Sequence, residues 1–352
     1  MNNILRRIFG AALLAGVVCS CSEWTEPESK AQKYPMVKDQ APELWSAYLE
    51  SLRNYKESEH KTVIAGFDNK ATTPSGRAEL LSGLPDSIDF VVLANPAELS
   101  DAIIADMKTI REEKGTRTLY AISYENTVAS YEAYKAEWEA AHKQPEEGSE
   151  ETPEIPSDGE QMMSRGEFVS SALADTLKLY ERYGYDGVIV SFTGSSTLAL
   201  TETEKAAERA LQDEFFGPVK EWMSAHKDAT VMFSGKPQNL LSEEFLPLCR
   251  DIIIPAESAG SADKLSFLVR SAMAENVPSD RFIICVSAPY GKLGLFGDTT
   301  AIEGAADWTL AADGTYSREG IMITHSQKDY FNALSYCNIR RAISIMNPSP
   351  KF

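Results

Sequence analysis

Short apolar runs rich in β-branched residues alternate with longer amphipathic stretches along the chain from Lys61 onward. This alternation is typical of βα units, in which each strand of a parallel sheet is followed by a helix. Eight runs have the length and composition of strands. They lie at Thr62–Phe67, Asp89–Ala94, Thr118–Ser123, Gly187–Phe192, Thr230–Ser234, Asp251–Pro255, Phe282–Ser287 and Gly320–His325.

Apolar residues at helical spacing predict the elements between these strands. The expected helices cover residues 98–113, 167–183, 202–225, 262–275 and 300–310, and a helix at 330–346 closes the chain. A short helix at 75–84 precedes the second strand, and an amphipathic helix at Glu43–Tyr55 is expected to cap the bottom of the sheet. Eight strands with intervening helices favour an α/β fold of the closed (β/α)8 type, the TIM barrel, over an open doubly wound sheet.

The first twenty residues have the parts of a secretory signal. Met1–Arg7 carries two arginines, Ile8–Val18 is apolar, and small residues lead to Cys21. This arrangement resembles a bacterial lipoprotein signal, in which residues 1–20 are removed and Cys21 is lipidated. A transmembrane helix is the alternative, but the apolar run is shorter than the ~20 residues that a bilayer core requires. We therefore expect acyl chains on Cys21 to anchor the protein to a membrane.

The rest of the chain divides into a short N-terminal tether and one large domain. Residues 21–60 contain a polar stretch, Ser22–Gln40, followed by the N-terminal helix. Residues 61–352 are expected to form one barrel, because a single barrel domain commonly reaches about this size. Within the barrel, residues 143–160 are rich in glutamate, proline and small polar residues, which predicts an acidic, solvated insertion.

Charge and cysteine usage exclude several classes of function. The chain has 34 basic and 52 acidic residues and a net charge of −18, which repels phosphate backbones, so nucleic acid is not an expected partner. After Cys21, the cysteines Cys249, Cys285 and Cys337 lack the spacing of metal ligands, and buried free thiols are expected. The four histidines do not cluster in the sequence. We therefore expect neither a metal nor another cofactor.

The most informative segment is 183–194, which reads YGYDGVIVSFTG and runs through the fourth expected strand. It resembles the fourth-strand signature of family 18 glycoside hydrolases, the chitinases and endo-β-N-acetylglucosaminidases, where the pattern is Asp-Gly-x-Asp-x-Asp-x-Glu. Residues two apart on a strand project to one face, here the barrel interior and its mouth. The resemblance implies that the final Glu is the general acid, and that the Asp two residues earlier orients the substrate acetamido group that attacks the anomeric carbon.

The catalytic positions of that signature carry no carboxyl group in this chain. Ile189, Ser191 and Thr193 stand where the family has Asp, Asp and Glu, and only Asp186 is retained. A hydroxyl is too weak an acid to protonate a leaving group at neutral pH, whereas a tuned carboxyl contributes roughly 10²–10⁴-fold as a general acid. The resemblance therefore predicts a barrel without hydrolase activity, in which the polar replacements can still form hydrogen bonds with a sugar.

Candidate glycan contacts lie at or just beyond the C-terminal ends of the expected strands, where barrels place their sites. Sugar recognition requires flat apolar faces together with a few fixed polar groups, and Tyr124 and Tyr290 are the expected platforms. The candidates are Asp68, Asn69, Tyr124, Glu125, Ser191, Thr193, Lys236, Glu257, Tyr290, His325 and Gln327.

The leading interpretation is an outer-membrane, cell-surface lipoprotein that captures N-acetylglucosamine-containing oligosaccharides, such as N-glycans, for uptake. The resemblance implies an outer-membrane transporter complex and companion glycosidases as partners. One alternative is an active endo-β-N-acetylglucosaminidase with relocated carboxylates, for which Glu125 and Glu257 are the candidates. Another is a protein-binding scaffold or adhesin, whose barrel mouth would be filled by large apolar side chains.

Overall fold

The computed structural model describes residues 37–71, 73–142, 161–311 and 313–348. The expected signal peptide, the lipidation site at Cys21 and the acidic insertion at 143–160 lie outside the described residues. Within the described ranges, no helix is both long and apolar enough to cross a membrane.

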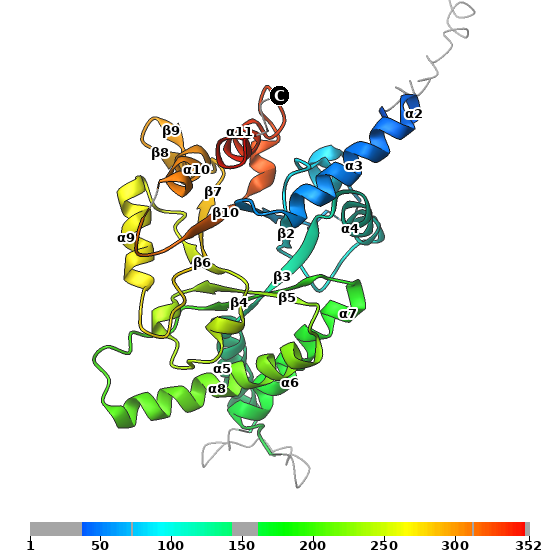
Figure 1. Cartoon of the computed structure of the whole chain (residues 1–352). Coiled ribbons are helices and arrows are strands. Elements are labelled where there is room, and N and C mark those ends of the chain that lie inside the picture. The colour runs from blue at the N-terminus through cyan, green and yellow to red at the C-terminus, as the bar shows by residue number, and fades with distance from the viewer. Residues whose placement is uncertain (1–36, 72, 143–160, 312, 349–352) are drawn as a thin grey trace, which may run out of the picture. The chain divides into compact units, whose positions relative to one another are not determined.

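Eight parallel strands close into a barrel in the order β1-β10-β7-β6-β5-β4-β3-β2. Figure 1 shows the strands as a ring with helices outside it. Each strand lies within two residues of an expected one, and the predicted (β/α)8 fold is confirmed. The strands are β1 (Thr62–Phe67), β2 (Phe90–Leu93), β3 (Arg117–Ser123), β4 (Gly187–Phe192), β5 (Thr230–Gly235), β6 (Ile252–Pro255), β7 (Phe282–Ser287) and β10 (Arg318–Thr324).

Most of the surrounding helices also follow the sequence pattern. They are α4 (Asp101–Lys114), α6 (Arg165–Leu177), α7 (Leu179–Tyr183), α8 (Glu202–Ala225), α9 (Ala262–Ala272) and α10 (Ala301–Leu310). Local capping sets their ends: Ser164 and Thr201 begin α6 and α8 with complete capping boxes. Gly115 ends α4 in the left-handed conformation, with φ of 69°, which glycine adopts without steric cost.

Three parts of the helical prediction are wrong. Helix α5 (Tyr124–Ala141) was not expected, and it begins directly after β3 because the Ser123 hydroxyl accepts the backbone N–H of Asn126. The closing helix at 330–346 is shortened to α11 (Cys337–Met346), preceded by the 3₁₀ turn η5 (Ser326–Asp329). The short helix at 75–84 is instead two 3₁₀ turns, η1 (Arg77–Glu79) and η2 (Leu81–Gly83).

Two connections of the barrel are irregular. Between β5 and β6 the chain forms only the 3₁₀ turns η3 (Pro237–Asn239) and η4 (Leu246–Leu248), so this βα unit has no α-helix. Between β7 and α10 a small hairpin is added, made of β8 (Leu295–Phe296) and β9 (Thr299–Thr300).

The N-terminal segment contains α2 (Val37–Gln40) and α3 (Pro42–Glu57). From Leu49 onward, α3 belongs to the same compact unit as the barrel. Lys56 donates to the carbonyl oxygen of Ile88, and Arg53 donates to that of Glu113, at 2.6 and 2.9 Å. Ile88 and Glu113 come shortly before the first residues of β2 and β3 in the sequence. This half of α3 therefore caps the bottom of the barrel, as expected.

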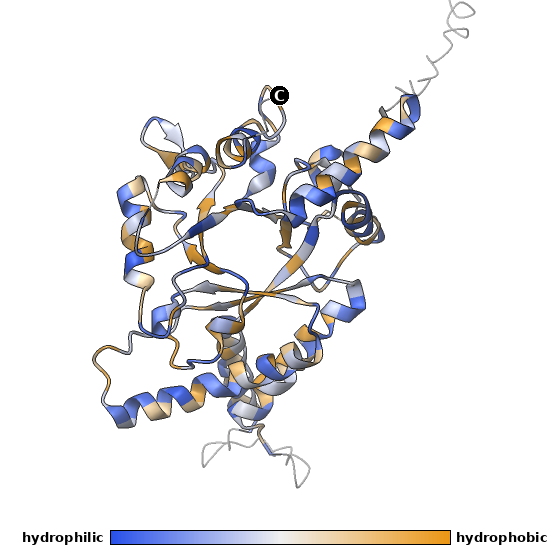
Figure 2. Ribbon diagram, in the orientation of Figure 1, coloured by the Kyte–Doolittle hydropathy of each residue, from blue (hydrophilic) through white to orange (hydrophobic). Residues whose placement is uncertain are grey.

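The hydrophobic core has two layers, and hydrophobic residues gather on the strands that separate them, as Figure 2 shows. The outer layer lies between strands and helices and includes Phe67, Tyr120 and Phe192, which are fully buried. The inner layer fills the barrel and includes Ile189 and Met232. This alternation follows from the two faces of each strand.

Candidate functional site

Small polar residues line the open end of the barrel above the inner core layer. Ser123, Ser191 and Ser234 are register neighbours on β3, β4 and β5, so their side chains form a row across three adjacent strands. Ala121 and Pro255 also belong to the inward-facing sets of their strands, yet both are exposed to solvent. The interior is therefore open to water at the C-terminal ends of the strands, where barrels place their sites.

The three altered signature positions occupy different depths of this opening. Ile189 is 2% exposed and belongs to the inner core layer, whereas Ser191 is half-buried and Thr193 is exposed at the rim. The Ser191 and Ser234 hydroxyls form no hydrogen bond with the part of the chain that the structure describes, and each can both donate and accept. These positions can bind a polar ligand but cannot supply a general acid.

Glu125, a candidate for a relocated acid, holds a loop instead. Its Oε1 accepts the backbone N–H groups of Thr193 and Gly194 at 2.6 and 3.0 Å. The Nδ2 atom of Asn239 donates to the carbonyl oxygen of Thr193 at 2.8 Å, so the start of the β4–α8 loop is held from both sides. An oxygen that already accepts two backbone donors is poorly placed to exchange a proton with a substrate. The sequence did not reveal this role, because it depends on α5 beginning directly after β3.

Glu257, the other candidate, follows β6 and is partly exposed. Its Oε1 accepts a weak hydrogen bond from the thiol of Cys285 on β7, with 3.5 Å between the sulfur and oxygen atoms. Burial, together with the nearby Glu257 carboxylate, raises the pKa of the Cys285 thiol well above its ordinary value. The thiol is therefore protonated and inert, as expected for a buried free cysteine. Glu257 remains a mouth carboxylate with capacity for a ligand.

Asp186, the retained signature acid, lies at the opposite end of the barrel. It precedes β4, and its Oδ1 accepts the Arg111 Nε donor at 2.7 Å. Its Oδ2 accepts Arg111 Nη2 at 2.9 Å and the backbone N–H of Thr118 at 2.7 Å. Because the strands are parallel, Asp186 is separated from Ser191 by the length of β4. Its position gives it a structural role between α4, β3 and β4.

Tyr290 and His325 form an aromatic pair at the mouth. Their rings stack with 4.7 Å between centroids and 20° between planes, and Tyr290 is 50% exposed. His325 follows β10 with φ of 54°, a left-handed conformation that is uncommon outside glycine. Strain of this kind is often found at functional sites. Lys328 adds a cation, its Nζ lying 5.2 Å from the Tyr290 ring centroid.

The hydrogen bonds around His325 assign its neutral tautomer. The hydroxyl of Ser287 donates to the carbonyl oxygen of Ala288 at 2.7 Å, which uses its only proton. The Nδ1 atom of His325 lies 3.2 Å from the same hydroxyl oxygen and is therefore the donor in that contact. The Nε2 atom then carries the lone pair, and it has no hydrogen-bond partner among the described residues. The neutral ring can accept a hydrogen bond from a ligand N–H or O–H group.

Three other expected site residues, Asp68, Asn69 and Gln327, take part in contacts between loops. The side-chain amide of Gln327 accepts the backbone N–H of Asp68 and donates to its carbonyl oxygen. The side-chain amide of Asn69 accepts the backbone N–H of Asn95 and donates to its carbonyl oxygen. These contacts favour loop-holding roles for Gln327 and Asn69. Asp68 itself is exposed, and its Oδ1 accepts the Lys70 backbone N–H at 3.2 Å.

Tyr124 is not the exposed platform that its position predicts. Its ring packs edge-on against Phe192 and Phe215 of the outer core layer, at 5.1 and 5.5 Å between centroids. Its hydroxyl accepts a hydrogen bond from Arg165 at 3.1 Å. As the first residue of α5, Tyr124 faces the helical layer. By contrast, Lys236 is exposed just after β5, and its ammonium has no ion-pair partner within the described ranges.

Two exposed apolar residues after β10 were missed by the sequence prediction. Phe331 and Leu334 are 76% and 73% exposed in the loop before α11. Asp329 organises this loop, because its carboxylate accepts the side chains of Asn332 and Asn338 and the backbone N–H of Ile339. The helix expected at 330–346 included both residues, so neither was considered as a candidate for the site.

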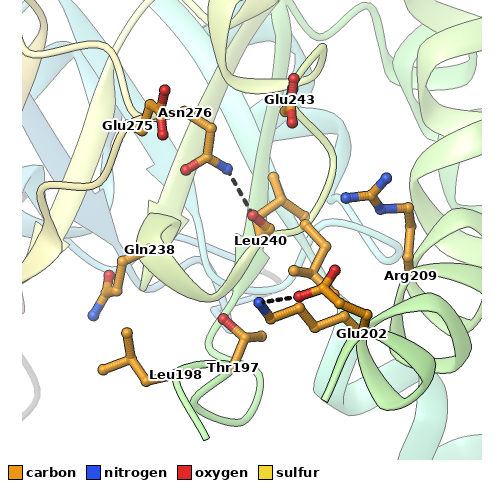
Figure 3. A pocket seen from close by; sticks show the side chains of 11 residues that line it. Thr197, Leu198, Glu202, Arg209, Gln238, Leu240, Glu243, Glu275 and Asn276 are labelled. Atoms are coloured by element: carbon orange, nitrogen blue, oxygen red, sulfur yellow. Dashed lines mark hydrogen bonds and ion pairs between the residues drawn. The ribbon is translucent and has the colours of Figure 1, made fainter. Parts of the chain in front are cut away.

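A polar groove of about 500 Å³ lies beside the β4 and β5 loops, as Figure 3 shows. Thr197 and Leu198 border it after β4, and Gln238 borders it after β5. Arg209 of α8 and Asn276, which follows α9, line other parts of the groove. Part of the groove is lined by the β5–β6 connection, in which the structure has no α-helix. Among the described residues, no group of His, Cys, Asp and Glu side chains could hold a metal ion.

Comparisons with known proteins identify similar sequences and structures. The chain matches glycoside hydrolase family 18, BT1044-like, over residues 25–345. It resembles the structure of BT1044 with a Glu-to-Gln substitution, at a TM-score of 0.63 and 20% identity, covering 89% of this chain and 96% of that one. A search of curated proteins found no match.

Two structures of an endo-beta-N-acetylglucosaminidase from Cordyceps militaris are also similar. The apo form has a TM-score of 0.57 and 13% identity, and covers 86% of this chain and 96% of that one. A doubly substituted form in complex with fucosyl-N-acetylglucosamine-Asn has a TM-score of 0.56 and 11% identity, with the same coverage. At these identities, the structural likeness establishes the fold.

Proposed function

Because the chain belongs to glycoside hydrolase family 18, in its BT1044-like group, yet has hydroxyls where the family signature has its acid, we propose that it binds glycans without cleaving them. The observation that carries this proposal is the chemistry of the β4 end. Ser191 and Thr193 have no acidic proton, and the nearby Glu125 is bonded to two backbone N–H groups. A substrate-assisted hydrolase needs a carboxyl acid beside the glycosidic oxygen.

The mouth offers the complementary groups of a sugar site. The free hydroxyls of Ser191 and Ser234 lie side by side on β4 and β5 and suit sugar hydroxyls. The Tyr290 and His325 rings present an aromatic surface, and Glu257 adds an acceptor. Sites of this kind combine flat apolar faces with a few fixed polar groups.

The proposed ligand class is an N-acetylglucosamine-containing oligosaccharide, such as an N-glycan. Support comes from the family and from the similar Cordyceps militaris enzyme in complex with fucosyl-N-acetylglucosamine-Asn. We further propose that lipidation at Cys21 anchors the protein at the outer surface of the outer membrane. There it would deliver glycans to a transporter complex and companion glycosidases.

Calorimetric titration with a biantennary N-glycan and with a chitin oligomer tests binding. We expect saturable heat with at least one ligand, and roughly tenfold weaker affinity for Tyr290→Ala and for the double variant Ser191→Ala, Ser234→Ala. Phe267→Ala is the matched control, because Phe267 is a 58% exposed aromatic on α9 that belongs to neither the mouth nor the groove. Equal loss in the control, or no heat with either glycan, would argue against a sugar site at the mouth.

Retained hydrolysis is the second candidate, and Glu257 is the observation that favours it. A carboxylate at the mouth, whose one hydrogen bond among the described residues comes from a thiol, could act on a substrate proton. That function would require glycan cleavage by the wild type and its loss in Glu257→Gln. The scaffold alternative has less support, because serines rather than large apolar side chains form the row across β3, β4 and β5 above the inner core layer.

A further inference from the structure

A second hollow lies at the end of the barrel opposite the mouth. Its volume is about 460 Å³, and it is lined by the C-terminal part of α3, by α4 and by residues at the N-terminal ends of β2, β3, β4 and β6. The ring of Phe90, from the inner core layer, forms part of its wall. The glycan site proposed above does not include this hollow.

The hollow is basic, although the chain carries a net charge of −18. Five of its lining residues are basic and three are acidic. Two of the acids are already neutralised by protein groups: Asp186 pairs with Arg111, and Asp89 accepts the backbone N–H of Val63 and a ring nitrogen of His60, at 2.8 and 2.9 Å. Glu57 is the remaining acid, and it is exposed.

Of the other basic groups, Arg250 pairs with the carboxylate of Asp251, whereas Arg53, Lys56 and Arg117 are in no ion pair among the described residues. Arg53 donates to a backbone carbonyl, that of Glu113, which leaves most of its N–H groups available. Lys56 donates to the carbonyl oxygen of Ile88 and to the hydroxyl of Thr116, and burial lowers the pKa of its ammonium to about 8. The guanidinium of Arg117 has no hydrogen bond or ion pair within the described ranges. Arg53 and Lys56 are partly buried and Arg117 is exposed, and a bound anion would stabilise the charged form of each group.

Arg250 completes the group and is fixed in orientation. Its guanidinium lies 4.6 Å from the centroid of the Phe90 ring, and its Nε is 3.2 Å from the carboxylate of Asp251. Stacking on an aromatic face holds the guanidinium while leaving N–H groups along its edge available. The hollow thus presents guanidinium groups from α3, β3 and the start of β6, and an ammonium from α3, around one space.

We propose that this hollow is a binding site for a phosphate monoester group. A phosphate monoester carries up to two negative charges and three terminal oxygens, which match several guanidinium groups and one ammonium. The volume exceeds that of phosphate alone, so the site has room for part of the group to which the phosphate is attached. Both a free sugar phosphate and a lipid headgroup carry this chemistry. Barrels usually place phosphate sites at the C-terminal face, so this site differs from that arrangement.

Titration of the full chain with glucose 6-phosphate, inorganic phosphate and glucose tests the site, with affinities measured by calorimetry. In a separate experiment, co-sedimentation measures binding of the protein to vesicles of phosphatidylcholine with and without phosphatidic acid. The variants are Arg117→Gln and the double variant Arg53→Gln, Arg117→Gln. Lys227→Gln removes the same charge from an exposed residue of the α8–β5 loop, outside the hollow, and is the matched control.

We expect saturable binding of a phosphate-bearing ligand, absent with glucose, that weakens about tenfold in Arg117→Gln and further in the double variant. Binding of the soluble phosphates would identify a free ester as the source, and binding of phosphatidic acid vesicles alone would identify a lipid headgroup. Equal weakening in Lys227→Gln would overturn the proposal, because it would show attraction by overall charge. Absence of binding in both arms would also overturn it.

Discussion

Substitution of Glu125 separates loop support from catalysis. In Glu125→Ala the backbone N–H groups of Thr193 and Gly194 lose the carboxylate that accepts them at 2.6 and 3.0 Å. A hydrogen bond to a charged group contributes about 1.5–3 kcal/mol, but water can reach this rim, so we expect a loss of about 1–3 kcal/mol in the free energy of unfolding. Glu125→Gln keeps an oxygen acceptor in the same place, and we expect a loss of about 1 kcal/mol or less.

The assay combines urea denaturation with glycan titration, and Glu132→Ala, an exposed residue on the same helix, is the control. Glu125→Ala should lower the stability and weaken glycan binding together, because the loop that carries Thr193 is released. Glu125→Gln should retain most of both properties. The reasoning is refuted if Glu125→Gln leaves stability intact but abolishes a glycan cleavage that the wild type performs, since Glu125 would then be the acid.

Three further substitutions test other parts of the account. Asp186→Ala should lower the free energy of unfolding by about 2–4 kcal/mol, because it leaves Arg111 unpaired, and it should leave glycan affinity unchanged. A loss of glycan affinity at constant stability would contradict the structural role of Asp186. His325→Asn keeps a donor for Ser287 and tolerates the left-handed backbone but removes the stacked ring, so titration should show roughly tenfold weaker glycan binding with stability within about 1 kcal/mol. Burial raises the pKa of Asp251 to about 6, so its protonated form stabilises the fold below about pH 4, and this stabilisation is lost as the pH rises through 6. The free energy of unfolding of Asp251→Asn should therefore exceed that of the wild type near pH 8, by on the order of 1–3 kcal/mol, and equal it near pH 4. Equal stability of the two proteins at pH 8 would contradict a raised pKa for Asp251.

The strands were predictable because each contains a short apolar run, most of which is buried. The start of α8 was predictable for a local reason, because the two residues of its capping box, Thr201 and Glu204, can be recognised in the sequence. Helix α5 was missed because its apolar residues are spread around the helix rather than gathered on one face. The closing helix was predicted too long, because the side-chain contacts of Asp329 that end it are not visible as a periodicity.

The candidate site was predictable in place but not in detail. Strand ends give the mouth, so Ser191, Tyr290 and His325 could be placed there from the sequence. The roles of Glu125 and Gln327 depend on which loops lie opposite them, and those contacts join residues 68 and 259 positions apart in the chain. The orientation of His325 likewise depends on the pairing of β7 with β10, which no local pattern encodes.

The most direct test of binding without hydrolysis analyses one mixture twice. The protein is titrated calorimetrically with a biantennary N-glycan that ends in its two core N-acetylglucosamine residues, and the recovered mixture is then separated by chromatography with mass detection. Saturable heat followed by recovery of intact glycan is the predicted result. Recovery of a glycan shortened by one N-acetylglucosamine, with the free sugar beside it, would contradict the account and would identify the chain as an active endo-acting hydrolase.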